Sequence, residues 1–382
     1  MAFKEFIIRS YESQSDRDQV ENLERRCKVG PSESVLDTMG DPICRIRNSP
    51  MYMMLVAELD NELVGVIQGS IKVVTVHPPK DLAKVGYVLG LRVAPHIRRK
   101  GIGSSLVQRL EEWFTSNDVD YAYVATEKDN HASVTLFMNK FGYTKFRTPV
   151  ILVNPVNHHS FRISSNIEIA RLKVEKAESL YRRFMGSTEF FPKDIENILR
   201  NKLSLGTWVA YFKDENNSWG DFGSNGHVPC SWAMLSVWNS GEIFKLRLGK
   251  APFSCLLFTK SWRLINKIFP CLKFPTFPNF FNPFGFYFMY GVYQEGAFSG
   301  KLVSALCQFV HNMAAKSKGD NCKIIVTEVG EQDELNHHIP HWKLLSCPDL
   351  WCIKALKNEG TNTFCELTNT PPRALFVDPR EV

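Results

Sequence analysis

Three consecutive cations and two glycines make residues 98–104 the stretch of this sequence with the clearest chemical potential. The letters there are RRKGIGS, with the glycines at positions 101 and 103. Guanidinium and ammonium groups attract phosphates, and glycines let a large anion approach the backbone. A turn whose charges are only solvated would have the same composition. The neighbouring elements must therefore decide between a solvated turn and an anion-binding loop.

The elements on either side place this stretch at the N-terminus of a helix. Residues 85–93, VGYVLGLRV, have the composition of a β-strand. After Gly103, apolar residues recur at helical spacing, at Leu106, Val107, Leu110, Trp113 and Phe114. A helix N-terminus presents unpaired backbone N–H groups and the positive end of the helix dipole. The sequence therefore predicts a phosphate site at this strand-to-helix turn.

Two known phosphate-loop patterns do not fit these residues. The P-loop has its lysine after the last glycine, whereas Lys100 precedes Gly101. The dinucleotide-binding fingerprint needs a third glycine, and none follows Gly103 at the required spacing. The pattern that remains is Arg-x-x-Gly-x-Gly on Arg98, Gly101 and Gly103.

The order of predicted elements over residues 1–157 indicates an α/β fold with a mixed sheet. Strands and helices are expected in the order β-α-β-β-β-α-β-α-β, from a strand at 6–11 to a last strand at 148–155. Flanking helices would cover the sheet, and its strands would carry the loop at residues 98–104.

Residues 158–382 repeat this order loosely. The strand-like run that ends in Thr327 and Glu328 lines up with the run that ends in Thr126 and Glu127. We therefore predict tandem domains with mixed sheets, 1–157 and 158–382, of which the second is degenerate. Two insertions are expected in the second domain: a polar, mobile loop at 213–231 and a segment rich in phenylalanine and proline at 250–286. The phenylalanine rings are expected to pack against the core or between the domains.

Composition excludes several classes of protein. Of the 382 residues, 44% are hydrophobic and 23% charged, which is typical of a globular protein. The net charge of +6 comes without a long lysine-arginine block, so a nucleic-acid partner is not indicated. We expect no signal peptide and no membrane span, and hence a location in the nucleus or cytoplasm. The ten cysteines are scattered without C-x-x-C pairs, so no metal site is expected.

The Arg-x-x-Gly-x-Gly pattern between a strand and an amphipathic helix resembles the pyrophosphate loop of the GNAT superfamily of acetyl-CoA-dependent N-acetyltransferases. Residues 128–143, KDNHASVTLFMNKFGY, resemble the family's next helix, which an asparagine opens and a Gly-aromatic pair ends. Longer runs, among them GDPICRIR, FRTPVILVNP, IPHWKLLSC and FVDPREV, resemble the HOOKLESS-type N-acetyltransferases of plants over almost the whole chain. This resemblance implies acetyl-CoA as cosubstrate and an amine acceptor on a protein, for example a histone, or on a small molecule. It also implies hormone-linked control of differential growth, through auxin and ethylene.

The same resemblance implies which residues contact acetyl-CoA. The loop amides and cations would bind the pyrophosphate, the preceding strand would pair with the pantetheine arm, and the following helix would approach the thiol. The residues implied are Leu91, Arg92, Val93, Arg98, Arg99, Lys100, Gly101, Ile102, Gly103, Ser104, Asn130, Ser133 and Phe137. For Asn130 and Ser133, plain helix capping is an equally good interpretation.

Transfer to an amine needs a base, and the family often takes it from a glutamate on the strand before the loop. Residues 85–93 contain no carboxylate. Glu127, Asp129 and Glu58 are the substitutes by position, although each would more often be a solvated surface charge. We take Glu127 as the candidate base.

An acid for the leaving thiolate is the second requirement. The family's tyrosine corresponds to Phe137 in this chain, which has no proton to donate. Tyr143 and Tyr87 remain as donors, although a tyrosine beside a sheet is more often structural. We take Tyr143 as the candidate acid.

The second half lacks the features of the loop. Its YQEGAFSGKL run keeps Gly296 and Gly300 but has no basic run, and Glu295 would repel phosphate. We predict that this half does not bind CoA and instead supplies acceptor selection, packing or assembly, which includes a homo-oligomer. Three functions stay open at this point: an active acetyltransferase, an acetyl-CoA-binding regulator without turnover, and a scaffold.

Overall fold

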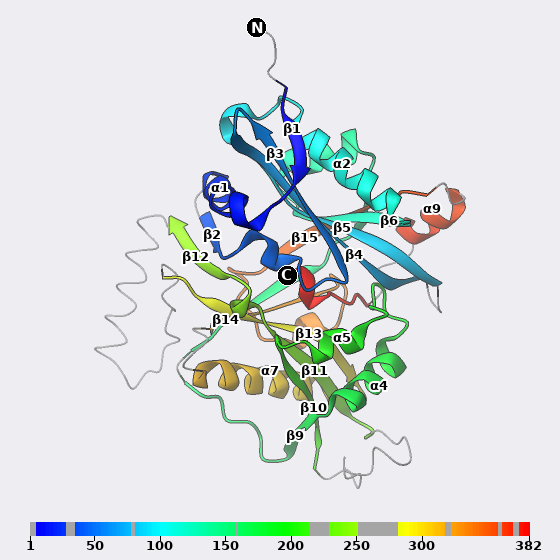
Figure 1. Ribbon diagram of the computed structural model, residues 1–382. Helices are drawn as coiled ribbons and strands as arrows, with labels where there is room; N and C mark the ends of the chain where they lie inside the picture. The colour runs from blue at the N-terminus through cyan, green and yellow to red at the C-terminus, as the bar shows by residue number, and fades with distance from the viewer. Residues whose placement is uncertain are drawn as a thin grey trace.

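The structure is a computed structural model, and it has the predicted α/β fold with a mixed sheet (Figure 1). It describes residues 5–27, 35–77, 81–157, 159–213, 229–250, 282–317, 322–357, 361–369 and 374–382. The predicted polar loop at 213–231 and the insertion at 250–286 lie largely outside the described residues, and both stay predictions.

The first half follows the predicted order of elements, with two additional strands, β2 and β7. Its strands are β1 (Ile7–Ser10), β2 (Val35–Met39), β3 (Met51–Leu59), β4 (Glu62–His77), β5 (Asp81–Val93), β6 (Tyr121–Glu127), β7 (Thr144–Arg147) and β8 (Val150–Pro155). Its helices are α1 (Ser13–Arg26), α2 (Ile102–Ser116) and α3 (His131–Val134), which continues as a π-helical segment, Thr135–Lys140.

The second half repeats this order with departures. Its strands are β9 (Ile167–Leu172), β10 (Ser204–Phe212), β11 (Trp232–Asn239), β12 (Lys245–Lys250), β13 (Gly285–Glu295), β14 (Cys322–Val329) and β15 (Cys347–Ala355). Its helices are α4 (Val174–Met185), α5 (Ile195–Arg200), α7 (Ser299–Lys316), α8 (Leu335–His338) and α9 (Thr361–Asn369). Where the repeat predicted a counterpart of the helix after Asn130, α8 makes a single turn and ends before Pro340, which cannot continue a helix.

Glycines on the strands let α2 lie close to the first half of the sheet. A Cβ atom on Gly65, Gly69 or Gly86 would lie 2.9, 2.7 and 2.7 Å from side chains of α2. Leu106, Leu110 and Phe114, the α2 residues involved, are fully buried, as their helical spacing predicts. This packing fixes α2, and with it the N-terminus of the helix, against β4 and β5.

The two halves exchange strands. β8 pairs with β14 of the second half from Val150 to Pro155, whereas β15 pairs with β6 and β7 of the first half. The strand predicted to close the first half therefore exists, but it extends the sheet of the second. The result is one 13-stranded sheet among the described residues, in the order β1-β3-β4-β5-β6-β15-β8-β14-β13-β11-β10-β9, with β7 beside β15. A division into domains at residue 157 stays a prediction.

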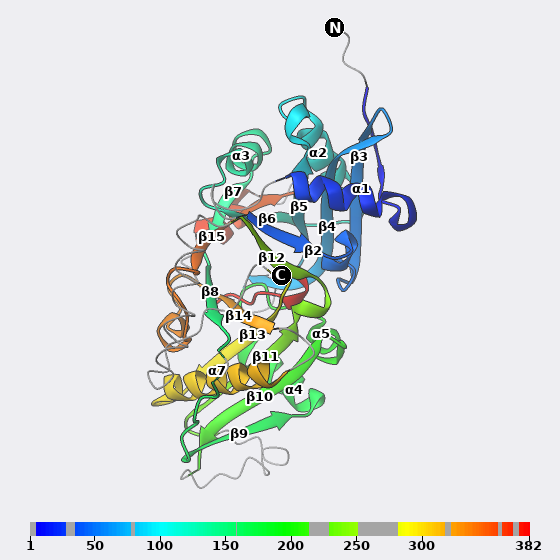
Figure 2. The same ribbon diagram turned by 90° about the vertical axis from the view of Figure 1, so that its left-hand side faces the viewer.

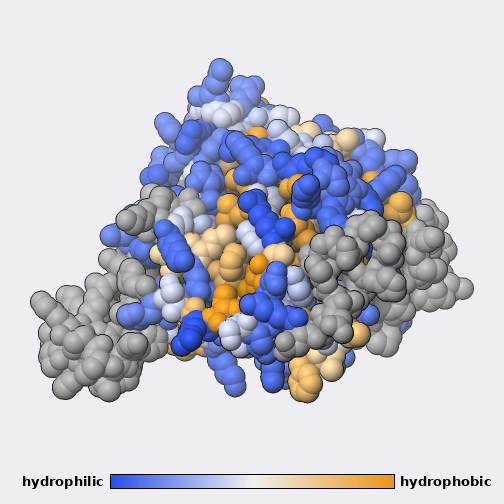
Figure 3. Space-filling model, turned by 90° about the horizontal axis from the view of Figure 1, so that it is seen from below, coloured by the Kyte–Doolittle hydropathy of each residue, from blue (hydrophilic) through white to orange (hydrophobic). Residues whose placement is uncertain are grey.

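The two halves also share a core beneath the C-terminal residues. In the second half, α7 packs with one apolar cluster. α4 and α5 pack with another cluster, which also contains Tyr123 of β6 and Trp351 of β15. The C-terminal residues lie between the halves (Figures 1 and 2). There, Glu381 accepts a hydrogen bond from Tyr123 (2.6 Å) and pairs with the ammonium of Lys72 (2.7 Å). Seen from below, the second half shows a central band of apolar residues bordered by hydrophilic ones (Figure 3).

Candidate functional site

Strands β5 and β6 diverge before they end. They pair in parallel from Val85 and Tyr121 to Val88 and Val124, yet β5 continues to Val93 and β6 to Glu127. On its other edge β5 stays paired with β4, across a register shift beside Gly90. Gly90 has φ +64°, a left-handed conformation that suits glycine. We call the diverging segments of β5 and β6 the first fork. Their facing backbone groups are unpaired with one another.

The predicted anion loop connects the first fork to α2. The side chains of Arg98, Arg99 and Lys100 are exposed, and Arg99 (φ +67°) and Gly101 (φ +89°) have left-handed backbone conformations. Within the described residues of the chain, the amides of residues 98–104 donate no hydrogen bond to a protein acceptor. A Cβ on Gly101 would meet nothing within 4 Å, so the space beside it is open. The loop has the unpaired donors and the charge of an anion site.

A fourth cation joins the loop from the π-helical segment. The ammonium of Lys140 donates a hydrogen bond of 2.7 Å to the hydroxyl of Ser104. Sequence reasoning missed Lys140, because nothing in the local spacing places the end of this segment opposite the start of α2. The contact also fixes the segment that follows Asn130 beside the loop.

The other predicted cofactor residues lie around the fork in different surroundings. Leu91, Arg92 and Val93 are partly buried on β5, and Ile102 is buried in the core. The carbonyl oxygen of Val93 accepts a hydrogen bond from Arg98 Nε (3.2 Å), which ties the loop to the strand. The guanidinium of Arg92 donates to the carbonyl oxygen of Leu91 (2.9 Å).

The helix that follows β6 contributes a cap and a core residue. The side-chain oxygen of Asn130 accepts a hydrogen bond from the Ser133 amide (3.2 Å), so Asn130 caps α3. Phe137 is buried and packs edge-on against the ring of Tyr143, with centroids 5.2 Å apart. Roles for these residues toward acetyl-CoA stay predictions.

Tyr143, the predicted acid, is buried beneath α2. Burial, followed by the nearby carboxylate of Glu111, raises the pKa of Tyr143 well above its ordinary value. Glu111 is itself paired with Lys354 of β15 (2.7 Å) and lies more than two turns along α2 from the loop. These surroundings favour a packing role for Tyr143. The alternative donor, Tyr87, is stacked on Tyr123 (centroids 4.8 Å apart) and buried enough for its pKa to be raised.

Three carboxylates lie on one face of the sheet between β6 and β14. Glu127 is exposed at the end of β6, and its partner across the ladder is Asp349 of β15. Glu328 of β14 is paired with Ile151 of β8, and Ile151 is paired on its other side with Cys347 of β15. Cys347 lies two residues before Asp349 on the same strand. Directly paired residues share a face, as do residues two apart on a strand. We call Glu127, Asp349 and Glu328 the carboxylate row.

Burial and the proximity of other carboxylates raise the pKa values of Asp349 and Glu328. Burial, with a contribution from Glu127, raises the pKa of Asp349 to about 6. Burial and the nearby Asp349 raise the pKa of Glu328 to about 8, although the indole N–H of Trp351 donates to its Oε1 (3.1 Å). At neutral pH Asp349 is therefore mostly ionised and Glu328 mostly protonated. A carboxylate that titrates near 6 is suited to act as a general base.

Of the carboxylates predicted as bases, only Glu127 belongs to this row. Glu58 lies on β3 and is paired with Arg9 of β1 (2.9 Å), and Asp129 is exposed in the turn before α3. Sequence reasoning missed Asp349, because it belongs to the second half and the strand exchange places it beside Glu127. Glu328 stood out in the sequence only as one residue of a repeated Thr-Glu dipeptide.

Comparison with known proteins agrees with this geometry. Residues 17–143 match the sequence model of the acetyltransferase (GNAT) family. The chain is 45% identical to "Probable N-acetyltransferase HLS1" of Arabidopsis thaliana, over 98% of its own length and 99% of that protein. The chain belongs to the GNAT acetyltransferase family. Within that family, the predicted similarity to the HOOKLESS-type proteins is confirmed.

Other relatives of this acetyltransferase have similar length. It is 32% identical to "Acetyl transferase GW6a" of Oryza sativa, with 98% of this chain and 97% of that protein covered. Among solved structures, the N-myristoyltransferase of Saccharomyces cerevisiae with bound myristoyl-CoA matches with a TM-score of 0.55 at 10% identity. That match covers 93% of this chain and 80% of the other, and it shows a shared fold.

Family membership makes an acyl-CoA the cosubstrate of this acetyltransferase. Within the described ranges, no group of three or more His, Cys, Asp or Glu side chains could hold a metal ion. Nor is any helix of the described residues long and apolar enough to cross a membrane.

Proposed function

We propose that this acetyltransferase transfers the acetyl group of acetyl-CoA, bound at the first fork, to a primary amine, with Asp349 as the general base. The observation that carries the proposal is the carboxylate row beside the fork. It supplies, from the second half of the chain, the base that β5 lacks.

The loop and the fork offer acetyl-CoA two kinds of contact. The unpaired amides of residues 98–104, with Arg98, Arg99, Lys100 and Lys140, would bind the pyrophosphate. The unpaired edge of β5 beyond Val88 would pair with the amides of the pantetheine arm, as an added strand would. The contact with the pantetheine arm uses backbone groups alone, whereas the contact with the pyrophosphate combines backbone amides with cationic side chains.

Asp349 is the best-placed member of the row for proton transfer. It is almost fully buried, so its charge is poorly screened, and its pKa of about 6 leaves it ionised at neutral pH. It would accept a proton from the acceptor ammonium. The neutral amine then attacks the thioester carbonyl, a C–N bond forms and the C–S bond breaks. The second proton of the nitrogen passes to the thiolate, so the products are the acetamide and CoA-SH, and Asp349 returns its proton to water.

This route needs no side-chain acid, which fits the burial of Tyr143 and the phenylalanine at position 137. The same two features support a second candidate, an acetyl-CoA-binding regulator without turnover. From the family resemblance we also propose a role in hormone-regulated differential growth, with histone amines among the acceptors.

One pair of measurements tests the proposal. Acetyl-CoA binding is measured by calorimetry, and release of CoA thiol is followed with a panel of lysine peptides, polyamines and histone tails. We expect the full chain to bind acetyl-CoA and release CoA with at least one amine, and Asp349→Asn to bind normally without release. Binding without release from the wild-type chain over the whole panel would instead favour the regulator.

A further inference from the structure

The second half repeats the fork of the first. β13 and β14 pair in parallel up to Met289 and Thr327, and both strands continue beyond that point. Gly291, two residues after Met289, has φ +58°, just as Gly90 lies two residues after Val88. We call the diverging segments of β13 and β14 the second fork.

The register of the second fork differs from the repeat that the sequence predicted. Glu127 lies three residues beyond Val124, the last paired residue of β6, whereas Glu328 directly follows Thr327, the last paired residue of β14. The predicted equivalence of the two Thr-Glu dipeptides is therefore wrong by two residues. As a consequence, Glu328 lies at the vertex of its fork, where the strands begin to diverge.

A cavity of about 570 Å³ lies within the second fork. Its walls combine aliphatic side chains, aromatic rings and carboxylates. The aliphatic side chains include Val292, Val329, Leu335, Leu375 and Val377, and the rings are Phe184, Tyr290 and Tyr293. The carboxylates are Glu328, Asp333 and Glu334, and no lysine or arginine is among the described residues that line the cavity.

Two polar atoms of the lining lack partners within the described residues. Glu328 Oε1 accepts from Trp351, and among the described residues Oε2 of this half-buried side chain has no hydrogen-bond partner. The side-chain oxygen of Gln294 is buried without a partner. The Gln294 oxygen is a buried acceptor without a partner, which is costly, and the Glu328 oxygen becomes an acceptor when that carboxyl is ionised. The cavity therefore favours a ligand that brings hydrogen-bond donors and a positive charge, which would hold Glu328 in its ionised form.

The charge of the cavity limits further which class of ligand can bind. Carboxylates without a compensating cation repel phosphate, which excludes CoA, whereas an alkylammonium brings a positive charge, three donors and an apolar stem. The stem suits the aliphatic wall, and aromatic rings attract ammonium groups. We propose that the second fork binds the acetyl acceptor as an alkylammonium, with its methylene chain along the aliphatic wall and its ammonium group at Glu328. This inference rests on the proposed function for the identity of the ligand as the acceptor.

The carboxylate row connects this cavity to the first fork. Glu328 is bonded to Trp351, whose ring stacks on Tyr123 (centroids 5.4 Å apart), and Tyr123 stacks on Tyr87 at the vertex of the first fork. Asp349 lies close enough to Glu328 to raise its pKa. An ammonium group at Glu328 is therefore next to the base.

The experiment compares two probes that differ in one group. Nα-acetyl-lysine methylamide ends in an ammonium group, and Nα-acetyl-norleucine methylamide ends in a methyl group on an otherwise similar chain. Binding of each to the full-length chain, without CoA, is measured by saturation-transfer NMR. We expect the lysine probe to bind and the norleucine probe to bind at least tenfold more weakly.

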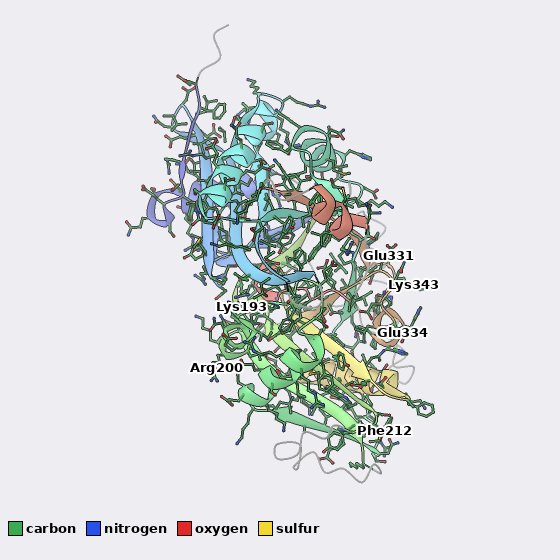
Figure 4. The ribbon with its side chains drawn as sticks, turned by 90° about the vertical axis from the view of Figure 1, so that its right-hand side faces the viewer. Lys193, Arg200, Phe212, Glu331, Glu334 and Lys343 are labelled. Carbon is green, nitrogen blue, oxygen red and sulfur yellow. The ribbon has the colours of Figure 1, made fainter. Side chains whose placement is uncertain are left out.

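Three single variants locate the site. Glu328→Gln keeps the shape of a side chain that is already mostly protonated, so the fold is expected to persist, and Glu334→Gln alters an exposed position. The matched control is Glu331→Gln. Glu331 is also exposed and lies on the same side of the molecule as Glu334 (Figure 4), but it is outside the cavity and accepts a hydrogen bond from Thr148. We expect about tenfold weaker binding of the lysine probe to Glu328→Gln, about threefold weaker binding to Glu334→Gln and no change in the control.

Equal binding of the two probes, or equal losses in Glu334→Gln and Glu331→Gln, would overturn the inference. The outcome is separable from that of the proposed function. If the lysine probe binds as expected but no amine is acetylated, the cavity stands and the transfer fails. If amines are acetylated with a KM that Glu328→Gln and Glu334→Gln leave unchanged, the transfer stands and the acceptor uses another site.

Discussion

The two forks are built from the same backbone device and differ in charge. Each is a pair of parallel strands whose pairing ends two residues before a left-handed glycine, Gly90 in one and Gly291 in the other. Beyond the first fork lie Arg98, Arg99 and Lys100, and beyond the second lies Glu295. The fold thus contains two openings between parallel strands. The loop that follows each opening determines the charge of the ligand that the opening accepts.

The helices that follow the two forks also differ, in the space beside the glycines at their N-termini. At the start of α2, a Cβ on Gly101 would meet open space. At the start of α7, a Cβ on Gly300 would lie 2.4 Å from the ring of His338, so protein already occupies that position. Beside Gly300 the backbone of α7 therefore has no room for a phosphate oxygen, and the run of three cations has no counterpart before this helix. Four predictions, in addition to those for the acceptor variants above, test this contrast between the two forks.

Replacement of the base has the largest expected effect. Asp349→Asn keeps the shape of the side chain but removes its ability to accept a proton, and general bases contribute roughly 10²- to 10⁴-fold. We expect kcat to fall about 10²-fold or more, with unchanged acetyl-CoA affinity, measured by thiol release and calorimetry. Glu127→Gln is the control, because Glu127 lies opposite Asp349 and is exposed, and it should lose less than about fivefold. If Glu127→Gln were the more damaging variant, the base would have been assigned wrongly.

Removal of the loop cations affects binding next. Replacement of Arg98, Arg99 and Lys100 together with alanine should weaken acetyl-CoA binding about 100-fold, at about 1 kcal/mol for each exposed charge. Calorimetry at fixed ionic strength measures this. The control removes three exposed cations of α1, Arg17, Arg25 and Arg26, and should leave affinity unchanged. An unchanged affinity in the loop variant would contradict the anion site.

The pH dependence of the rate probes the row directly. Protonation of Asp349, whose pKa is raised to about 6, removes the base, so kcat should fall about tenfold per unit as the pH drops below 6. The charge of Glu127 contributes to the raised pKa of Asp349, and Asp349 in turn raises the pKa of Glu328. Values of kcat measured in buffers from pH 5 to 9 give this acidic limb of the pH–rate profile. In the Asp349→Asn variant this fall in rate at low pH should disappear. If the fall persisted, it would be caused by a group other than Asp349.

The smallest effect concerns the cation that sequence reasoning missed. Lys140→Met removes the charge and the hydrogen bond to Ser104 but keeps most of the side-chain length. We expect acetyl-CoA binding to weaken about threefold to fivefold, as for one exposed ion pair. Lys145→Met, a substitution of another lysine near the C-terminal end of this segment, is the control. Equal affinity of both variants would place Lys140 outside the site.

The sequence was sufficient for the features of the site that depend on neighbouring residues. The loop, the start of α2 and the Asn130 cap lie within short, continuous stretches, where glycines, charges and helical spacing act locally. Asp349 could not be found this way, because it reaches Glu127 only through the exchange of β15. The position of Glu328 depends on strand register, and a shift of two residues changes no local pattern.

The strand exchange has a consequence for the synthesis of the protein. β6 leaves the ribosome more than 220 residues before β15, the strand that pairs with it, is complete. At translation rates of about 5–20 residues per second, the edge of β6 waits roughly 10 to 45 seconds for its partner. During that time an unpaired strand edge is exposed, which invites wrong pairing with other nascent chains. The chain cannot complete its first half early and its second half later, because the sheet of the first half is completed only when β15 has been synthesised.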